Sequence, residues 1–408
     1  MLLGVDVGGT FTDAVLLDGG RVLTAKAPTT PADQAEGVLA AVAAVLEQAR
    51  RPASAVERFA HGMTVATNAL LEGRAARTAL LATEGFTDLI ELGRQARPEL
   101  YRLCAAPPAP LVPPERRYGV AERMGPRGVL RALEGADLLE RLAACEPEAV
   151  AVVLLHAYAH PEHERRLGEL LAERLPGVHV SLSHELVGTV REYERAATTE
   201  VDAALSPLVG RYLDALATRA AEAGLPEPAV MQSSGGLATA AQASAHAALT
   251  VLSGPAGGAQ AAELIASLCR EPDLLCFDMG GTSCDVSLIS AGQARETAER
   301  MLAGRPLALP MLDIHTVGAG GGSIAWRDGG GALRVGPRSA GAEPGPACYG
   351  RGGREPTVTD ANLLLGRLPA VASGVALDRG AALAAVGELA GALGVEAPEC
   401  AEGIVRVA

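Results

Sequence analysis

One eight-residue pattern occurs twice in this chain. It reads Asp-x-Gly-Gly-Thr-x-x-Asp, at residues 6–13 within GVDVGGTFTDAVL and again at residues 278–285 within CFDMGGTSCDVSL. Each copy follows a short apolar run and precedes another, which predicts two β-strands joined by a tight glycine turn. Because a chain of 408 residues exceeds what one hydrophobic core usually serves, we expect two lobes with one hairpin each.

The residue types in these turns suit an anion. Glycines let backbone N–H groups approach a phosphate closely, and hydroxyl side chains add donors. The predicted phosphate-binding residues are Gly8, Gly9, Thr10 and Thr12 in the first copy and Gly280, Gly281, Thr282 and Ser283 in the second. One copy alone would equally fit an ordinary hairpin turn, but the repetition of five fixed residues favours function.

The aspartates of the pattern are predicted to serve catalysis. Asp6 and Asp278 would repel a phosphate unless a cation lay between them, so we expect them to hold Mg²⁺ through water. Asp13 and Asp285 have two interpretations: each could orient a threonine hydroxyl or a water molecule, or could cap its own turn.

The composition disfavours several classes of protein. With 49% hydrophobic and 20% charged residues the chain can bury a large core. The net charge of −13, without any Lys/Arg run, disfavours a nucleic-acid partner. Seven cysteines without a CxxC pair disfavour a secreted disulfide framework, and the sequence lacks a basic leader and a long uncharged apolar stretch. We therefore expect a cytoplasmic protein that does not contact membranes.

Phrases along nearly the whole chain resemble the hydantoinase A/5-oxoprolinase family of the actin-like ATPase superfamily. The most specific phrases are residues 61–101, 191–207, 230–237, 315–326 and 335–368. The resemblance implies an α/β, actin-like (ribonuclease H-like) two-lobed ATPase fold, in which the two hairpins clamp a nucleotide from opposite sides. Residues 253–268 (SGPAGGAQAAELIASL) resemble the helix that connects the lobes.

The resemblance also implies a division of the chain. Residues 1–185 would form the N-terminal region with the first phosphate loop, and residues 190–408 the hydantoinase/oxoprolinase domain with the connecting helix and the second loop. Family members continue well beyond the phrase TDANLLLGRL, whereas this chain ends soon after it. We therefore expect a shortened second lobe with an open adenine site, which another chain completes unless the chain is a fragment or has lost the activity.

The activity implied by the resemblance is ATP-dependent opening of a cyclic amide such as a hydantoin or 5-oxoproline. A lactam is resonance-stabilised, and phosphorylation of its carbonyl oxygen would make the carbonyl carbon easier for water to attack. ATP and Mg²⁺ are the implied cofactors, and a hydantoinase B-type second subunit is the implied partner; a homo-oligomer is compatible with this picture. The alternatives are an ATP-using ketone carboxylase subunit and a non-catalytic nucleotide-binding assembly protein.

Other polar residues have both a functional and a structural interpretation. Arg94 and Arg97, in GRQARPELY, could bind a substrate carboxylate or phosphate, or could belong to a solvated loop. His61 could end a strand and face the cleft with a substrate-binding role, or could be a structural histidine. The histidines of HAYAHPEHE (residues 156–164) fit a strand-to-helix turn better than a zinc site.

Three segments predict helices that bear on the architecture. The segment from residue 30 predicts a helix with Thr30 as N-cap, and residues 191–223 predict a long helix that Pro207 breaks or kinks. Two further helices are expected after Leu368. The glycine cluster at residues 318–322 indicates turns, and Ser323 could border the nucleotide or belong to a turn.

Overall fold

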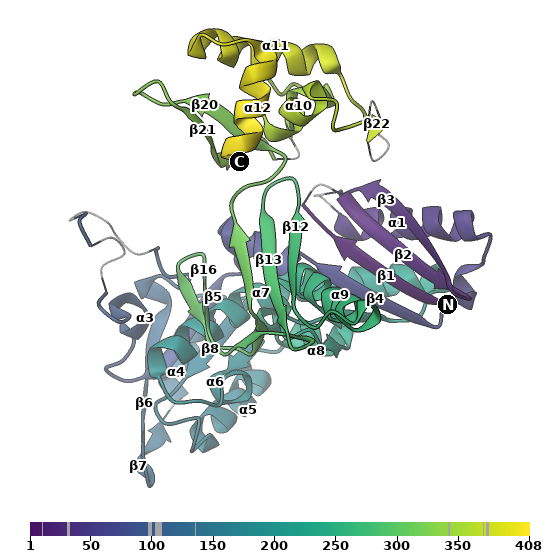
Figure 1. The fold of residues 1–408 in the computed structure, drawn as a ribbon. Coiled ribbons are helices and arrows are strands. Elements are labelled where there is room, and N and C mark those ends of the chain that lie inside the picture. Colours follow the sequence, from purple (N-terminus) through teal and green to yellow (C-terminus); the bar gives the residue numbers. More distant parts are fainter. Residues whose placement is uncertain are drawn as a thin grey trace.

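The chain has a mixed α/β architecture with two hairpins that stand near each other (Figure 1). The structure is a computed structural model that describes residues 1–9, 11–30, 33–96, 100–102, 108–134, 136–341, 343–369, 371–372 and 375–408. The N-terminal sheet lies to one side, helix α7 (Glu192–Glu222) crosses the middle, and the hairpin of β12 (Leu274–Met279) and β13 (Cys284–Ser290) rises toward a C-terminal group of helices.

The N-terminal sheet has six strands in the order β11-β10-β4-β1-β2-β3. The antiparallel pair β1 and β2 forms the first hairpin, and β1, β4 and β10 run parallel. This sheet takes strands from both sides of the boundary predicted near residues 185–190. Its strands are β1 (Leu2–Val7), β2 (Phe11–Asp18), β3 (Arg21–Pro28), β4 (Arg58–Met63), β10 (Pro228–Met231) and β11 (Leu237–Ala238).

The burial of successive side chains alternates along β1, and the buried side chains form one face of this sheet's core. Leu3, Val5 and Val7 of β1 are buried, whereas the residues between them are more exposed. This alternation of every second residue is typical of a strand with one covered face. Helix α1 (Gln34–Ala49) supplies the other side of this core with a stripe of alanines and valines. The helix begins after Asp33 rather than after Thr30, and Thr30 instead accepts a hydrogen bond from the Gly37 N–H at 3.0 Å.

A second sheet is inserted between β4 and β10. Its five strands have the order β7-β6-β5-β8-β9, and β6, β5, β8 and β9 are parallel. Every residue of β5 and β8 is buried, as expected for parallel strands covered on both faces. The elements of this unit are β5 (Thr78–Thr83), β6 (Arg117–Gly125), β7 (Gly128–Glu134), α4 (Ala136–Ala143), β8 (Ala149–Val153), α5 (Glu162–Arg174) and β9 (His179–Leu182).

The histidines between β8 and α5 do not converge on a metal site. His163 bonds to Glu122 at 2.7 Å, whereas His160 lies 3.2 Å from the Pro126 carbonyl. Within the described ranges no group of three or more histidine, cysteine or acidic residues is arranged to hold a metal ion. The predicted strand-to-helix turn is confirmed.

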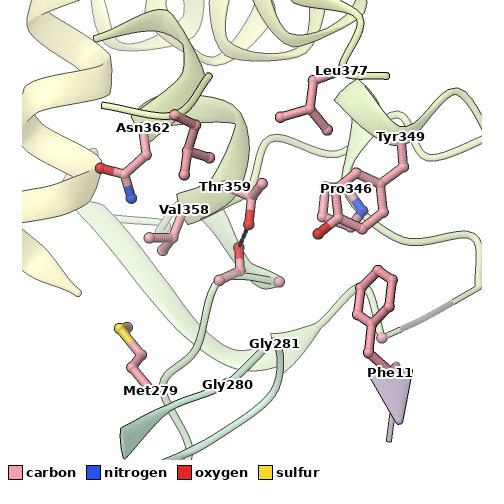
Figure 2. A pocket seen from close by; sticks show the side chains of 14 residues that line it. Phe11, Met279, Gly280, Gly281, Pro346, Tyr349, Val358, Thr359, Asn362 and Leu377 are labelled. Carbon is pink, nitrogen blue, oxygen red and sulfur yellow. Dashed lines mark hydrogen bonds between the residues drawn. The ribbon is translucent and has the colours of Figure 1, made fainter. Parts of the chain in front are cut away.

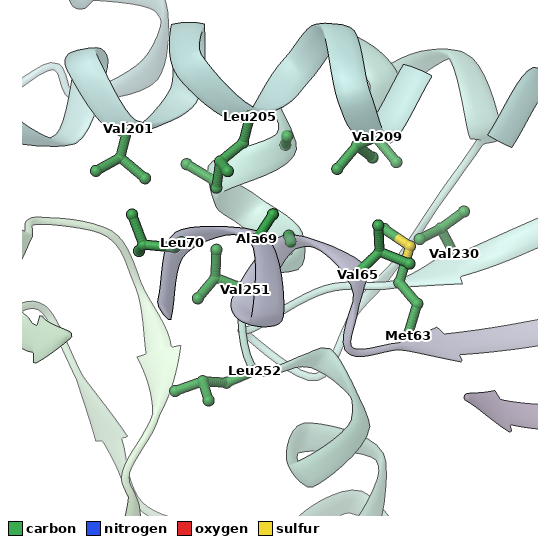
Figure 3. Close-up of a cluster of buried hydrophobic side chains, with 14 of the residues drawn as sticks. Met63, Val65, Ala69, Leu70, Val201, Leu205, Val209, Val230, Val251 and Leu252 are labelled. Carbon is green, nitrogen blue, oxygen red and sulfur yellow. The ribbon is translucent and has the colours of Figure 1, made fainter. Parts of the chain in front are cut away.

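Helix α7 is continuous through Pro207, so the break, one of the two predicted alternatives, does not occur. Val201, Leu205 and Val209 of this helix are fully buried against α2 (Val65–Leu71) and the segment near Val251 (Figure 3). A proline inside a helix costs about 3 kcal/mol. Burial of several aliphatic side chains, each contributing about 1.5–3 kcal/mol, outweighs that cost.

The second hairpin belongs to a smaller sheet in which β13 also pairs with β19 (Ile314–Val317). Helix α9 (Ser253–Cys269), at the place predicted for the connecting helix, packs beside it through Ala256 and Ala259. Above the hairpin tip lie β20 (Ser323–Arg327), β21 (Leu333–Ser339), α10 (Val358–Leu364), α11 (Arg379–Leu393) and α12 (Ala397–Val407) (Figure 1). The two helices expected after Leu368 are therefore confirmed as α11 and α12.

The remaining elements are short. They are α3 (Leu89–Leu92), α6 (Ser183–Leu186), α8 (Ala240–Ala245), β14 (Gln293–Ala294), β15 (Glu296–Thr297), β16 (Arg300–Leu302), β17 (Arg305–Leu307), β18 (Met311–Leu312), β22 (Val371–Ala372), β23 (Val375–Ala376) and the 3₁₀ turns η1 (Ala53–Ala55), η2 (Pro114–Arg116), η3 (Ala247–Thr250) and η4 (Ala347–Tyr349). Across the described part of the chain no single helix is long and apolar enough to cross a bilayer, and α11 with α12 reaches that length only as a pair bent by 89°.

His61 is a structural residue of the N-terminal sheet. Its side chain lies within β4, is fully buried, and its Nε2 is 2.8 Å from the Tyr212 hydroxyl of α7. Of the two interpretations of His61, the buried position fits the structural one, because the alternation of β4 turns this side chain toward α7. Burial lowers the pKa of His61 to about 4.

We predict that replacing Leu205 with alanine lowers the free energy of unfolding by about 2–5 kcal/mol, because the substitution leaves a cavity in a fully buried position. Urea unfolding measures this change. The matched control is Leu383→Ala on α11, where the leucine is 52% exposed and the loss should be small. Equal losses in the two variants would contradict the burial of α7.

We also predict that His61 makes the fold sensitive to acid. Because its pKa is lower in the folded protein than in the unfolded chain, the unfolded chain binds the proton first, and stability falls as the pH drops from about 6.5 toward about 4, by at most about 3 kcal/mol. Urea unfolding at pH 7 and pH 4.5 should show a smaller pH effect in His61→Gln than in the unaltered protein. His315→Gln, at an exposed histidine, should keep the full effect.

Candidate functional site

The two hairpins have the same geometry. Asp6 lies directly opposite Asp13 in the first, and Asp278 opposite Asp285 in the second. The turns close in the same way, since the N–H of Gly8 donates to the Phe11 carbonyl at 3.0 Å and that of Gly280 to the Ser283 carbonyl at 2.9 Å. The predicted pair of glycine hairpins is therefore confirmed as structure.

The second aspartate of each hairpin is held by the neighbouring strand. Lys26 of β3 forms an ion pair with Asp13 at 2.6 Å, and Thr316 of β19 donates a hydrogen bond to Asp285 at 2.6 Å. Burial, followed by the charge of Asp278, raises the pKa of Asp285 despite this bond. These contacts favour a structural role for the two aspartates.

The first aspartates have no such partners in the described residues. Part of the Asp6 carboxylate remains open to solvent, but the chain around it displaces much of its water. This desolvation is the main cause that raises the pKa of Asp6 to about 6, and the charges of Asp13 and Asp278 raise it further. Because the Asp278 charge acts on Asp6, the acidic ends of the two hairpins lie near each other.

Two glycines outside the repeated pattern make room for Asp6. A Cβ atom at Gly62 of β4 would lie 2.7 Å from the Asp6 carboxylate oxygen, and one at Gly254 in the first turn of α9 would lie 3.0 Å from it. The carboxylate therefore sits between a strand and the start of the connecting helix. Sequence reasoning did not single out these glycines, although both lie in segments that carried the family resemblance.

The glycine cluster at residues 318–322 packs on the second hairpin. The N–H groups of Gly321 and Gly322 donate to the carbonyls of Gly280 and Gly281 at 3.0 and 2.6 Å. A Cβ at Gly320 would lie 2.7 Å from the backbone of Gly281. The cluster, expected either to form turns or to border the nucleotide, is thus a backbone support for the hairpin tip.

The predicted loop residues are not equally accessible. Gly9, Gly280, Gly281 and Thr282 are exposed, and Gly8 and Ser283 are half-buried. Thr12 is fully buried, with its hydroxyl 3.3 Å from that of Thr29, because the alternation of β2 turns it into the core. Thr12 therefore does not present a donor at the loop surface. Thr10 lies outside the described residues.

Of the two predicted substrate-binding arginines, the structure describes Arg94, which is held by a helix rather than by the hairpins. Arg94 follows α3 and forms a two-bond ion pair with Glu194 of α7, at 2.8 and 2.6 Å. It lines neither of the pockets beside the hairpins. Arg97 lies outside the described residues. Ser323 is buried and accepts a hydrogen bond from the Gly320 N–H at 2.9 Å, so it stabilises the turn.

A pocket of about 340 Å³ joins the two hairpin tips to the C-terminal helices. Phe11 and Tyr349 lie on one side, and Val358 and Asn362 on the other (Figure 2). The lining is mostly apolar and carries no charged residue in the described part of the chain. It consists of Phe11, Met279, Gly280, Gly281, Gly321, Gly322, Gly341, Pro346, Tyr349, Val358, Thr359, Asn362, Leu368 and Leu377.

Buried hydrogen bonds hold the walls of this pocket. Thr359 donates its hydroxyl to the Gly321 carbonyl at 2.8 Å (Figure 2). Asp360, which is fully buried, accepts hydrogen bonds from the N–H groups of Cys348 and Thr357 and so fixes the turn that carries Tyr349. The pocket is therefore supported by α10.

Comparison with known proteins places the whole chain in one group. The sequence model of the hydantoinase/oxoprolinase N-terminal region matches residues 2–175, and that of hydantoinase/oxoprolinase matches residues 195–408. The chain is 37% identical to the caprolactamase subunit alpha of Pseudomonas jessenii, over 99% of this chain and 60% of that protein. It is 38% identical to 5-oxoprolinase 1 of Arabidopsis thaliana, over 89% of this chain and 31% of that protein.

Solved structures give the same result for the fold. ATP-dependent caprolactamase from Pseudomonas jessenii matches with a TM-score of 0.84 at 36% identity, and nucleotide-free acetone carboxylase with a TM-score of 0.85 at 27% identity. Each match covers 100% of this chain and 61% of the other. These likenesses confirm the predicted fold class. With both family matches and both folds in agreement, the chain belongs to the hydantoinase/oxoprolinase family.

Proposed function

We propose that this chain binds ATP between its two hairpins and uses it to open a cyclic amide. The observation that carries the proposal is the proximity of the hairpins. The charge of Asp278 raises the pKa of Asp6, and Phe11 of one hairpin lines the same pocket as Gly280 and Gly281 of the other. Two hairpins of the same pattern that both contribute to one cavity fit a single polyphosphate better than two separate anions.

The carboxylates fit a hydrated magnesium ion. Asp6 and Asp278 lie near each other and form no ion pair among the described residues, and the pKa of Asp6 stays raised because the distant charge of Lys26 offsets only part of the burial and repulsion. Mg²⁺ typically uses one or two carboxylates with waters and phosphate oxygens. The absence of a three-ligand cluster in the described ranges fits this mode, because phosphate and water supply the other ligands. We assign Asp6 and Asp278 as its ligands.

The exposed turns would bind the phosphates. Gly8 and Gly9 in one hairpin, and Gly280 and Gly281 in the other, can bring backbone N–H groups close to phosphate oxygens, while Thr282 adds an exposed hydroxyl. The pocket lined by Phe11 and Tyr349 suits the nucleobase, because its described lining is mostly apolar, includes two aromatic rings and carries no charge, and Asn362 offers an amide. Burial of a planar ring against such side chains is favourable.

The chemistry follows from the stability of amides. ATP would supply a phosphoryl group to the amide carbonyl oxygen, which makes the carbonyl carbon more reactive toward water. The residues of this chain would orient the two reactants and neutralise charge. We further propose that the chain is an alpha-type subunit that acts in the cytoplasm with a hydantoinase B-type subunit; caprolactamase, one of its relatives, has an alpha subunit by name.

A ketone carboxylase subunit is the second candidate. It is supported by the fold likeness to acetone carboxylase and by 36% identity to the gamma subunit of acetophenone carboxylase from Aromatoleum aromaticum. ADP release by the purified chain, with and without a B-type subunit, would be measured with hydantoins, lactams and ketones. Stimulation by ketones but not by amides would replace the first proposal with the second.

We predict that Asp6→Asn and Asp278→Asn each lower Mg-ATP turnover by at least about 100-fold, since each removes a carboxylate that neutralises charge where phosphoryl transfer occurs. ADP release measures the rate, and thermal unfolding checks that the fold is intact. Asp214→Asn, at an exposed position of α7, serves as the control and should keep the full rate. Unaltered rates in both hairpin variants would refute the cation assignment.

A glycine substitution tests the support of the second hairpin. We expect Gly320→Ala to weaken ADP binding by about tenfold or more, because its Cβ would displace the backbone of Gly281, and overpacking of this kind costs about 1–3 kcal/mol. The control is Gly318→Ala in the same segment, where an added Cβ meets no atom within 4 Å. Equal ADP affinity of the two variants in equilibrium titrations would show that the cluster does not position the hairpin.

A further inference from the structure

The second hairpin has a strand edge that is covered in the first hairpin. In the N-terminal sheet β1 lies between β2 and β4 and pairs with both. Within the described residues β12 pairs with β13 alone, so it is the last strand of its sheet (Figure 1). The hairpins otherwise have the same register, since Asp6 lies opposite Asp13 and Asp278 opposite Asp285. The strand β4 therefore has no described counterpart beside β12.

The backbone groups along this edge of β12 point away from the hairpin. In the first hairpin the Val7 carbonyl accepts a hydrogen bond from the Thr64 N–H, directly after β4, at 3.2 Å. Met279 holds the position equivalent to Val7. Because hydrogen bonds alternate along an antiparallel pair and Gly280 donates to Ser283, every second residue of β12 back from Met279 directs its backbone groups away from β13. An edge of this kind can pair with another strand.

The sheet face at this edge is apolar and exposed. Leu275 and Phe277 are 69% and 64% exposed, whereas Leu3 and Val5 at the equivalent positions of β1 are 2% and 3% exposed. Helix α1 covers these positions in the first sheet. The exposed set, named here the β12 face, consists of Leu275, Phe277, Met279 and Leu288, whose counterparts Leu3, Val5, Val7 and Leu16 are all buried. A contiguous apolar surface on an ordered sheet marks an interaction site.

Asp278 lacks the neighbouring strand that lies beside Asp6. Gly62 of β4 is level with Asp6, and a Cβ atom at Gly62 would lie 2.7 Å from the Asp6 carboxylate oxygen. A strand in the equivalent position beside β12 would set one residue level with the exposed Asp278. The same close approach would require a glycine there, and the added strand would displace water from Asp278.

We propose that the free edge of β12 and the β12 face bind a second polypeptide of a different kind. It adds a parallel strand beside β12, with a glycine level with Asp278, and lays an apolar helix on the β12 face, as β4 and α1 do in the first sheet. The chain covers 60% of the caprolactamase subunit alpha of Pseudomonas jessenii. The occupant is a polypeptide of the kind that makes up the remaining part of that protein.

A second copy of this chain fits the surface less well. Under the two-fold symmetry that most dimers have, the β12 edges of two copies would run antiparallel, unlike the parallel pair of β1 and β4. The sequence of β12, LLCFDM, also offers no glycine to lie level with Asp278. The β12 face therefore calls for a different polypeptide rather than for itself.

Co-expression tests the proposal. The probe is the part of Pseudomonas jessenii caprolactamase subunit alpha that this chain does not match, produced together with the full 408-residue chain. Light scattering of the purified material, without nucleotide, should give the mass of a one-to-one complex. Hydrogen exchange of residues 274–279 should slow by at least about tenfold in the complex. The absence of a complex, or self-association of the chain through β12 instead, would overturn the proposal.

A single substitution locates the interface. Leu275→Asp should weaken the complex by at least about 100-fold, because it buries a carboxylate in an apolar contact. Since Leu275 is exposed in the chain alone, the unfolding temperature of that variant should stay the same. The matched control is Leu130→Asp on β7, where the leucine is 73% exposed, and it should keep full affinity. Equal affinities of the two variants would show that the partner binds elsewhere.

The effect of the partner on Asp278 rests on the proposed function, whereas the binding surface does not. If Asp278 holds Mg²⁺, removal of water around it strengthens its attraction for the ion, and the complex should bind Mg-ADP at least about tenfold more tightly than the chain alone. If the complex depends on Leu275 but Mg-ADP affinity is unaltered, the surface assignment stands and the proposed role of Asp278 fails. If the chain alone turns over Mg-ATP and no complex forms, only this inference fails.

Discussion

The position of the Asp6 carboxylate is the constraint on which the rest of the site depends. This group belongs to the penultimate residue of β1, and it lies against Gly62 of the neighbouring strand β4 and against Gly254 at the start of α9. A side chain at either glycine would enter the space that the carboxylate occupies. The strand β1, its neighbour β4 and the connecting helix α9 therefore meet at the Asp6 carboxylate. Along the chain, α9 is followed by the second hairpin.

Electrostatics explain why this arrangement suits a cation. Desolvation and two like charges raise the pKa of Asp6, so an ionised carboxylate at this position is unfavourable in the chain alone. Asp13 differs, since Lys26 neutralises it across the strand pair. A divalent ion would supply the missing compensation for Asp6 and Asp278. The structure thus separates the four repeated aspartates into two pairs with different surroundings.

The two pockets beside the hairpins differ in the chemistry of their linings. The one at Phe11 and Tyr349 is apolar and aromatic, while the one at Gln34 and Asn68 is polar. Each touches a glycine turn, so a molecule in either pocket would have a hairpin backbone beside it. The contact of both pockets with the hairpins supports a phosphate position between them.

Local pattern was sufficient to predict part of this molecule. The strands β1, β2, β12 and β13 and the two helices after Leu368 follow from apolar runs, glycine turns and periodicity, which act within a few residues, whereas helix α9 was expected from the family resemblance. The repeated aspartates and exposed glycines were also predictable, because the same short pattern makes the same hairpin twice. The family phrases predicted the fold class because they occupy nearly all of the chain.

Only the tertiary structure decided which predicted residues face a ligand and which support the fold. The burial of Thr12 and of His61, the ion pair of Arg94, and the unbroken helix at Pro207 depend on neighbours far away in the chain. The contact of Gly320 with the second hairpin and the exposure of the β12 face likewise arise from how elements meet. The sequence by itself therefore determined the two hairpins and the residues that they carry, whereas packing between distant segments determined which of those residues are buried, because burial and charge compensation are properties of neighbours in space.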